Sequence, residues 1–225
     1  MRIPLFIEFR GKKVAVIGGG NVGTSRAKKF LEVGADVTVF SLEFSEELKK
    51  LGRDGKIKLV ERKVEDLEKE LSEFDLVVVA IGDKSQNVRF KEIARKYKFL
   101  LNLANDANET EVVVPFEGGK DGIRFAVTTE GKSGVVARIV RDKFQQVLES
   151  DRTIFTYLTA MEHLKAFMKS REIPINIRMR VYAIAGSSEE LLKLSELGKV
   201  EEAKKLVERI AEEEARKGDS LESGF

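Results

Sequence analysis

A glycine-rich hexapeptide constrains the fold of this chain more than any other feature of the sequence. Residues 18–23 read Gly-Gly-Gly-Asn-Val-Gly, which matches the pattern Gly-x-Gly-x-x-Gly. The apolar run Val14–Ile17 precedes it directly and is typical of a strand buried on both faces. From Val22 to Val33 apolar residues follow at helical spacing, and Gly34 stands where a helix would end. This order predicts a βαβ unit whose loop binds the diphosphate of a dinucleotide.

Each position of the loop has its own physical role in this interpretation. Gly18 permits the tight turn, Gly20 lets the backbone approach the diphosphate, and Gly23 lets the helix pack closely on the strand. Asn21 and Val22 begin the helix, where unpaired N–H groups and the positive end of the helix dipole favour an anion. We therefore expect these five residues to bind the cofactor. The alternative is a glycine turn that binds no ligand.

The cofactor's ribose is expected about 20 residues further on, at the end of the second strand. Glu43 is the only acidic residue near that point, slightly beyond the expected strand Asp36–Phe40. It could equally belong to the first turn of the next helix, where an acidic residue is favourable in any case. No arginine directly follows the strand, which favours NAD over NADP. Gly82, after a later strand, is a further candidate for cofactor binding.

Alternating apolar runs and amphipathic stretches continue through the first half of the chain. They predict parallel strands joined by right-handed crossovers, and hence an α/β fold with a Rossmann-type doubly wound parallel sheet. Further strands are expected at Ile57–Val60, Leu76–Ile81 and Phe99–Leu103, and helices around Phe44–Leu51, Val64–Leu71 and Val88–Tyr97.

The pattern changes near residue 110. Val112–Phe116 and Ile123–Thr128 flank a Gly-Gly-Lys-Asp-Gly sequence, which predicts a hairpin. A helix begins near Ser133, and the stripes Ile154–Met168 and Val200–Ile210 predict further helices. We therefore predict a NAD-binding Rossmann domain at 1–110, a small strand-containing segment at 111–150 and a helical C-terminal domain at 151–225.

Composition narrows the classes of function. The chain has no cysteine, which excludes disulfides, thiolate metal sites and cysteine nucleophiles. Its formal net charge of +2 favours neither nucleic acid nor an anionic membrane. No apolar run is long enough to span a bilayer, and Glu8 and Arg10 interrupt the apolar N-terminal stretch, so we expect a cytoplasmic protein. The single histidine, His163, cannot build a multi-histidine site, and we predict no metal ligands.

Polar residues after the later strands are candidates for substrate chemistry, because ligands of open α/β sheets bind beyond the carboxyl ends of the strands. Asp106 could be a general base or an orienting carboxylate, and its alternative role is that of a turn or cap residue. Ser133 is placed to cap the following helix. Lys132 and Arg138 could hold an anion, or they could simply form a solvated charged face.

Together these residues resemble the precorrin-2 dehydrogenases of sirohaem synthesis, including the N-terminal module of bacterial sirohaem synthase. The resemblance rests on Ile3–Ile7 running into Gly11–Val14 and the glycine loop, on Asn102–Asp106, and on Thr128–Arg138. It implies oxidation of precorrin-2 to sirohydrochlorin with hydride transfer to NAD and loss of a proton. Some members also insert ferrous iron, Fe2+, as a second substrate. The resemblance further implies a homodimer whose contact lies after the Rossmann domain.

The resemblance also implies residue roles. Precorrin-2 is a polycarboxylate, so contacts are expected from Asn102, Thr129, Lys132, Ser133 and Arg138. The family's functional Asp falls on Asn105 here, and an amide cannot accept a proton at neutral pH. The catalytic assignment is therefore Asp106, with Asn105 orienting, and iron insertion is the more doubtful activity.

Two other functions stay open. A regulatory module that senses NAD would bind the dinucleotide but would leave the block 128–138 unexplained. A tetrapyrrole chelatase without redox activity is kept open by the change at Asn105.

Overall fold

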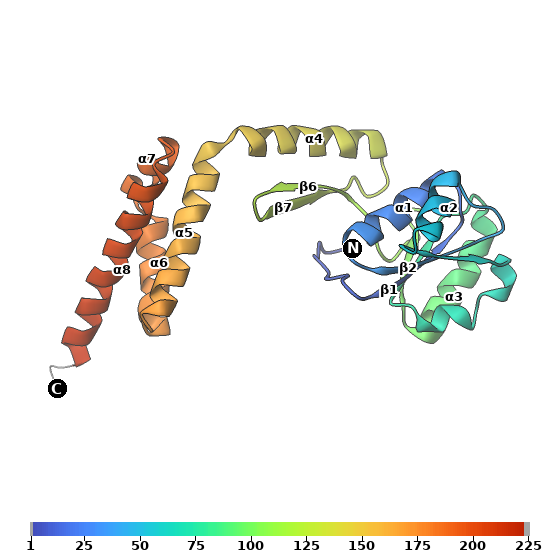
Figure 1. The fold of residues 1–225 in the computed structure, drawn as a ribbon, viewed down its shortest axis with the longest axis horizontal. Helices are drawn as coiled ribbons and strands as arrows, with labels where there is room; N and C mark the ends of the chain where they lie inside the picture. Colours follow the sequence, from blue (N-terminus) through green and yellow to red (C-terminus); the bar gives the residue numbers. More distant parts are fainter. Residues whose placement is uncertain (1, 223–225) are drawn as a thin grey trace. The chain divides into compact units, whose positions relative to one another are not determined.

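The structure is a computed structural model that describes residues 2–222, with side chains as far as residue 217. The chain forms two compact units, whose elements are drawn in Figure 1. The sheet unit contains the residues up to Phe116 together with Val127–Arg138. The helical unit contains Glu117–Ala126 and the residues from Ile139 onward. The division into 1–110, 111–150 and 151–225, with its assigned roles, stays a prediction.

A five-stranded parallel sheet forms the centre of the sheet unit (Figure 1). Its register places Ile17 of the central strand between Phe40 and Val79 of its two neighbours. The direction of strand addition reverses at β1, which creates a switch point at the carboxyl edge of the sheet. This arrangement confirms the predicted Rossmann-type doubly wound sheet. The strands are β1 (Lys13–Ile17), β2 (Asp36–Ser41), β3 (Lys58–Glu61), β4 (Leu76–Val79) and β5 (Leu100–Leu103), in the order β3-β2-β1-β4-β5.

Helices cover both faces of the sheet because its central strands are apolar on both faces. On one face, Ala27 and Phe30 of α1 and Leu48 of α2 pack against the side chains of β1, β2 and β4. On the other face, Phe90 and Ile93 of α3 pack against β1, β4 and β5. The three helices are α1 (Asn21–Glu32), α2 (Glu46–Arg53) and α3 (Asn87–Tyr97).

The segment between β3 and β4 differs from the prediction. The expected helix over Val64–Leu71 is replaced by two short 3-10 helices, Val64–Asp66 and Glu70–Glu73. Leu67 and Leu71 are fully buried in the core on the α3 face. Their four-residue spacing, which suggested a helix, therefore reflects two separate anchors of an irregular segment.

The predicted hairpin is present in the helical unit, but its first strand lies further along the chain. β6 spans Phe116–Lys120, rather than Val112–Phe116, and pairs with β7 (Ile123–Val127). Gly118 lies within this strand, where the Phe125 ring leaves no room for a side chain, because a Cβ would lie 2.5 Å from it. The turn is formed by Asp121 and Gly122, whose φ angles of 48° and 89° suit a two-residue hairpin.

Four helices build the core of the helical unit, where the sequence indicated two stripes. α5 packs on α7 and α8, and α6 packs on α8. Leu164, Met168, Val181, Leu191 and Val207 are fully buried between them. Within the described residues, no helix has the length and apolar character needed to cross a membrane. The helices are α4 (Gly134–Ser150), which starts in the sheet unit, α5 (Arg152–Ser170), α6 (Ile175–Gly186), α7 (Glu189–Glu196) and α8 (Val200–Glu222).

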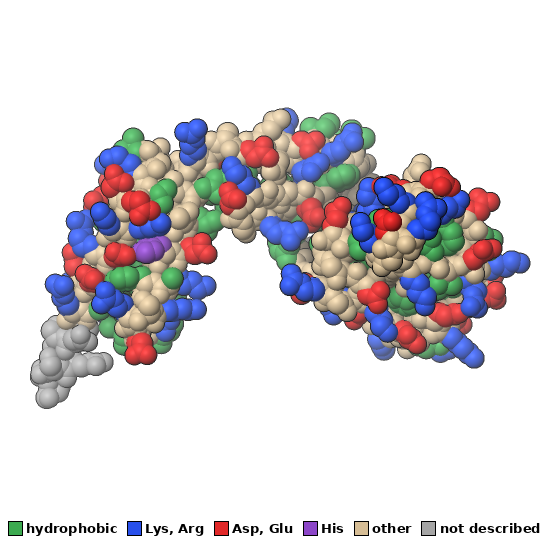
Figure 2. Space-filling model, in the orientation of Figure 1, with side chains coloured by type: hydrophobic (Ala, Val, Ile, Leu, Met, Phe, Trp, Pro, Cys, Tyr) green, Lys and Arg blue, Asp and Glu red, His purple; other side chains and the backbone are tan. Residues whose placement is uncertain are grey.

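Charges of both signs are interspersed over the visible surface of both units (Figure 2). This distribution agrees with the small formal net charge of +2.

Candidate dinucleotide and substrate site

Close backbone contacts shape the glycine loop between β1 and α1. Gly18 has a φ of +112°, and a Cβ there would lie 2.7 Å from the carbonyl oxygen of Ala80. A Cβ at Gly19 would lie 2.1 Å from the carbonyl oxygen of Glu43, and one at Gly23 would lie 1.9 Å from that of Gly18. Only glycine fits these three positions without a shift of the backbone.

Gly20 differs from its neighbours, because no atom apart from those of the adjoining residues lies within 4 Å of the place where its Cβ would be. Gly20 is also the N-cap of α1 and carries no side chain that could occupy the helix end. In the described part of the chain, the amides of Asn21, Val22 and Gly23 find no hydrogen-bond acceptor. Open space before three unpaired amides, at the positive end of a helix, fits the diphosphate of a dinucleotide.

Hydroxyl groups tie this loop to the start of α2. Thr24 Oγ1 donates to the Gly20 carbonyl oxygen over 2.9 Å and lies 2.8 Å from Ser45 Oγ. The Ser45 amide donates to the Gly19 carbonyl oxygen over 3.0 Å, and its hydroxyl caps α2 by accepting from Leu48. The loop is therefore held in its binding shape by the protein itself.

Glu43 lies outside the helix to which the sequence could also assign it. β2 ends at Ser41, and α2 begins at Glu46 after the cap Ser45. Glu43 is exposed between these two elements. A first-turn role in α2 is thus excluded, and the contact with the cofactor's ribose stays a prediction.

Asn105 joins two segments at the carboxyl edge of the sheet. Its Nδ2 donates to the carbonyl oxygen of Ile81 after β4 over 2.9 Å, and its Oδ1 accepts from Nδ2 of the buried Asn87 over 3.0 Å. This pair of bonds needs one donor and one acceptor on the same side chain, which an ionised carboxylate cannot provide. Gly82, also after β4, is exposed and has no atom within 4 Å of its Cβ position.

Asp106 organises the turn that follows β5. One carboxylate oxygen accepts from the amides of Asn108 and Glu109, and the other lies 3.6 Å from Lys84 Nζ. Burial raises the pKa of Asp106, but the two amide bonds and the charge of Lys84 together outweigh it, so the pKa lies below its ordinary value. A carboxylate with a lowered pKa is a weak proton acceptor. The geometry therefore gives Asp106 the turn role, and a catalytic role stays a prediction.

Asn102 is buried on β5 and only 3% exposed. Its Nδ2 donates to the carbonyl oxygen of Val112 over 2.6 Å. The side chain thereby anchors the segment after β5, and its predicted substrate contact stays a prediction.

The segment 128–133 forms a tight loop before α4. Thr129 Oγ1 accepts from the Ser133 amide over 2.9 Å and donates to the Ser133 carbonyl oxygen over 3.0 Å. Ser133 Oγ accepts from the amide of Val136 over 3.2 Å, as expected for a helix cap. Lys132 and Arg138 are exposed on this loop and on the first turns of α4.

This loop packs on the turn after β5, with a backbone that L residues rarely adopt. Glu130 and Gly131 have φ angles of 52° and 85°. A Cβ at Gly131 would lie 2.4 Å from the Cβ of Ala107. A non-glycine residue in the left-handed region costs about 1–2 kcal/mol, so other contacts must hold Glu130 in place.

Arg2 supplies such contacts, and sequence reasoning missed it. Its guanidinium donates to Glu130 Oε2 over 2.5 Å and to the carbonyl oxygens of Ala107 and Thr110 over 2.8 and 2.7 Å. No local pattern marks this residue, because its partners lie more than 100 positions away.

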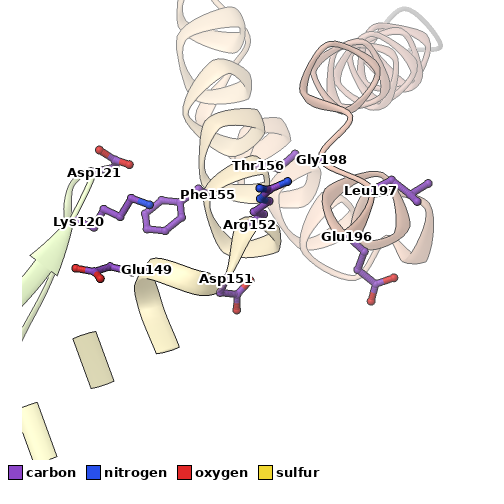
Figure 3. A pocket seen from close by; sticks show the side chains of 10 residues that line it. All are labelled: Lys120, Asp121, Glu149, Asp151, Arg152, Phe155, Thr156, Glu196, Leu197 and Gly198. Carbon is purple, nitrogen blue, oxygen red and sulfur yellow. The ribbon is translucent and has the colours of Figure 1, made fainter. Parts of the chain in front are cut away.

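A cavity of about 420 Å³ lies in the helical unit and contains none of the predicted site residues (Figure 3). Lys120 lies 4.7 Å from the centre of the Phe155 ring, and Asp151 caps α5 at its edge. His163, purple in Figure 2, pairs with Glu208 over 2.6 Å. Among the described residues there is no cluster of three His, Asp or Glu that could hold a metal ion.

The sheet order, the glycine loop and its unpaired amides define a Rossmann-type dinucleotide-binding domain. In agreement, residues 5–116 match a family described as "Putative NAD(P)-binding".

Relatives identify the family more closely. A Methanocaldococcus jannaschii protein named "Putative precorrin-2 dehydrogenase" is 32% identical over 201 residues, which cover 86% of this chain and 96% of that protein. A Psychromonas ingrahamii "Siroheme synthase" is 25% identical over 96% of this chain, but the match spans only 45% of that longer protein. The solved structure "SirC, precorrin-2 dehydrogenase" has the same fold, with a TM-score of 0.66 over 92% of this chain and 100% of that chain at 19% identity. The chain belongs to the precorrin-2 dehydrogenase family.

Proposed function

We propose that this protein oxidises precorrin-2 to sirohydrochlorin with NAD as the hydride acceptor, in the synthesis of sirohaem. The match along 96% of the Methanocaldococcus jannaschii relative, named "Putative precorrin-2 dehydrogenase", carries the proposal. The cytoplasmic location expected from the sequence belongs to the same proposal.

The chain's own residues bind and orient the two reactants. The amides of Asn21, Val22 and Gly23 bind the diphosphate, and the open side of Gly20 admits it. When bound, the nicotinamide ring would accept the hydride that the macrocycle loses, and the accompanying proton would be released to water. Glu43 is proposed to contact the ribose. The absence of an arginine directly after Ser41, where β2 ends, supports NAD over NADP.

The substrate's carboxylates are proposed to meet the start of α4. Lys132 and Arg138 are exposed there, and Ser133 and Thr129 hold the loop that presents them. Asp106, next to this loop, is proposed to act mainly by ordering the turn after β5. A carboxylate that already accepts two amides is better suited to that task than to proton removal.

A homodimer is proposed to form through the chain after the Rossmann domain. Ile139, Phe144 and Val147 of α4 are 48%, 54% and 63% exposed in the helical unit. Apolar side chains exposed together on one helix commonly mark a protein interface.

Iron insertion is not included in the proposed reaction. Asn105 stands where a carboxylate is expected, and its two hydrogen bonds require an amide. For Asn105→Asp, we expect a loss of about 1–3 kcal/mol of stability, because a carboxylate oxygen would face the Ile81 carbonyl. We also expect no gain of Fe2+ insertion. Denaturant unfolding measures the stability, and an anaerobic assay with sirohydrochlorin measures Fe2+ insertion. Fe2+ insertion by the native chain would overturn this part of the proposal.

The decisive experiment is anaerobic incubation of the protein with precorrin-2 and NAD, followed by absorbance of sirohydrochlorin and NADH. We expect both products in equal amounts, and less of them with NADP. A folded protein that binds NAD but gives no turnover and no affinity for tetrapyrroles would instead support the NAD-sensing module. Binding of sirohydrochlorin with metal insertion but no redox turnover would support the chelatase.

A further inference from the structure

Arg2 contacts two separate segments of the sheet unit through one side chain. Its Nη2 donates to the carbonyl oxygens of Ala107 and Thr110, and a longer contact of 3.5 Å reaches that of Asn108. Its Nη1 forms the ion pair with Glu130. Arg2 thus reaches both the turn after β5 and the loop 128–133.

The geometry of these bonds calls for an arginine. Two carbonyl oxygens and one carboxylate oxygen are reached from two nitrogens of a planar group, whereas a lysine offers one compact ammonium. The Arg2 side chain is 26% exposed, so its bonds are partly shielded from water. Its partners on the turn after β5 are main-chain atoms, so changes of side chain there leave these bonds intact.

The segments that Arg2 joins are the ones proposed to meet the substrate. The turn after β5 carries Asp106, and the loop 128–133 carries Lys132 and ends at Ser133. Gly131 also packs directly on Ala107 between them. The contacts of Arg2 therefore fix the relative position of the two loops.

We propose that Arg2 is a positioning residue that holds the turn 106–110 and the loop 128–133 together as one binding surface for the substrate's carboxylates. This inference rests on the proposed function, because it takes precorrin-2 as the ligand of that surface. It requires the effect of Arg2 to fall on the substrate and not on the dinucleotide, whose glycine loop is held by other contacts.

The test compares Arg2→Ala, Arg2→Lys and Glu130→Gln with the matched control Arg10→Ala, an exposed arginine of the same N-terminal segment. We expect Arg2→Ala to raise the KM for precorrin-2 about tenfold or more, while the Kd for NAD stays within about twofold. Arg2→Lys should restore part of the loss, because it keeps the charge opposite Glu130. Glu130→Gln should have a smaller effect, since the carbonyl contacts remain.

Hydrogen exchange supplies a readout that does not depend on turnover. Arg2→Ala should speed the exchange of amides in 106–111 and 128–134 and leave Gly18–Gly23 unchanged. Unchanged exchange in the two segments, or a KM equal to that of Arg10→Ala, would overturn the inference. An equal weakening of NAD binding would overturn it too, since Arg2 would then support the whole unit. If the native chain does not oxidise precorrin-2, the proposed function fails, and the exchange result alone decides whether Arg2 joins the two loops.

Discussion

Two loops at the same edge of the sheet reach their shapes by opposite means. The loop Gly18–Gly23 is determined by the absence of side chains, because a Cβ at three of its positions would collide with main-chain atoms. The loop 128–133 is determined by side chains, through the Thr129–Ser133 pair and the ion pair of Arg2 with Glu130. Where main-chain sterics set the shape, at Gly18, Gly19 and Gly23, no other residue fits without a shift of the backbone. A loop shape set by several hydrogen bonds loses stability gradually, because each substitution removes only one or two of these bonds.

Gly23→Ala should produce the largest effect. Its Cβ would meet the Gly18 carbonyl oxygen at 1.9 Å, so helix α1 must shift away from the loop. We expect a loss of about 3 kcal/mol in stability and of about 100-fold or more in NAD affinity. Denaturant unfolding measures the stability, and calorimetric titration measures the NAD affinity. The control is Gly186→Ala, where no atom lies within 4 Å of the added Cβ. Native-like NAD binding by Gly23→Ala would contradict the view that main-chain sterics determine the shape of this loop.

Gly20→Asp separates binding from folding within the same loop. The position is open, so the protein should fold with a melting temperature close to that of the native chain. The added carboxylate would compete with the diphosphate for the amides at the start of α1, and we expect about 100-fold weaker NAD binding. Gly20→Ala serves as the neutral control. Retained NAD affinity in Gly20→Asp would place the diphosphate elsewhere.

Two variants of Asp106 test whether the neighbouring turn acts through its hydrogen bonds or through proton transfer. Asp106→Asn keeps an acceptor for the amides of Asn108 and Glu109, whereas Asp106→Ala removes it. For an ordering role we expect turnover within about threefold of native for Asp106→Asn and a loss of about tenfold for Asp106→Ala. Equal, large losses in kcat for both would identify Asp106 as the base.

The pH dependence of stability gives a second measure of Asp106. Its pKa is lowered in the folded protein by the two amide bonds and Lys84, against the effect of burial. The carboxylate therefore stabilises the fold above its unfolded pKa of about 3.9, and this contribution is lost as the pH falls through the lower, folded pKa. Thermal melting should show the difference between native and Asp106→Asn shrinking below about pH 4. A difference that stays constant with pH would contradict the lowered pKa.

Thr129→Val should have the smallest effect. It removes both hydrogen bonds between Thr129 and Ser133 while keeping the shape of the side chain. We expect a loss of about 1 kcal/mol in stability and a rise of about threefold in the KM for precorrin-2. Thr129→Ser, which keeps the hydroxyl, is the matched control. A loss of stability as large as that of Gly23→Ala would mean that the loop 128–133 tolerates substitution no better than the glycine loop.

Local patterns were sufficient to predict the sheet, because each buried strand is a short apolar run and each crossover begins or ends at a recognisable signal. The glycine loop was predictable for the same reason. The segment 64–71 misled because two buried leucines four residues apart imitate a helical stripe. The strand β6 was displaced because Gly118 and Gly119 pair with β7, although glycines usually mark a turn.

The substrate side was harder to predict because its contacts are long-range. Asn102 stands in a promising block, yet its side chain is directed into the protein by the carbonyl of Val112. Arg2 carries no motif at all, and only the folded chain brings it to Glu130.

The link between Thr24 and Ser45 has a consequence for how the enzyme cycles. Together with the bond from the Ser45 amide to Gly19, it joins the glycine loop and the start of α2 into one hydrogen-bonded unit. A unit that is already assembled loses little conformational entropy when its ligand arrives. The cofactor proposed to bind here would therefore be exchanged between rounds of oxidation without any refolding of the loop.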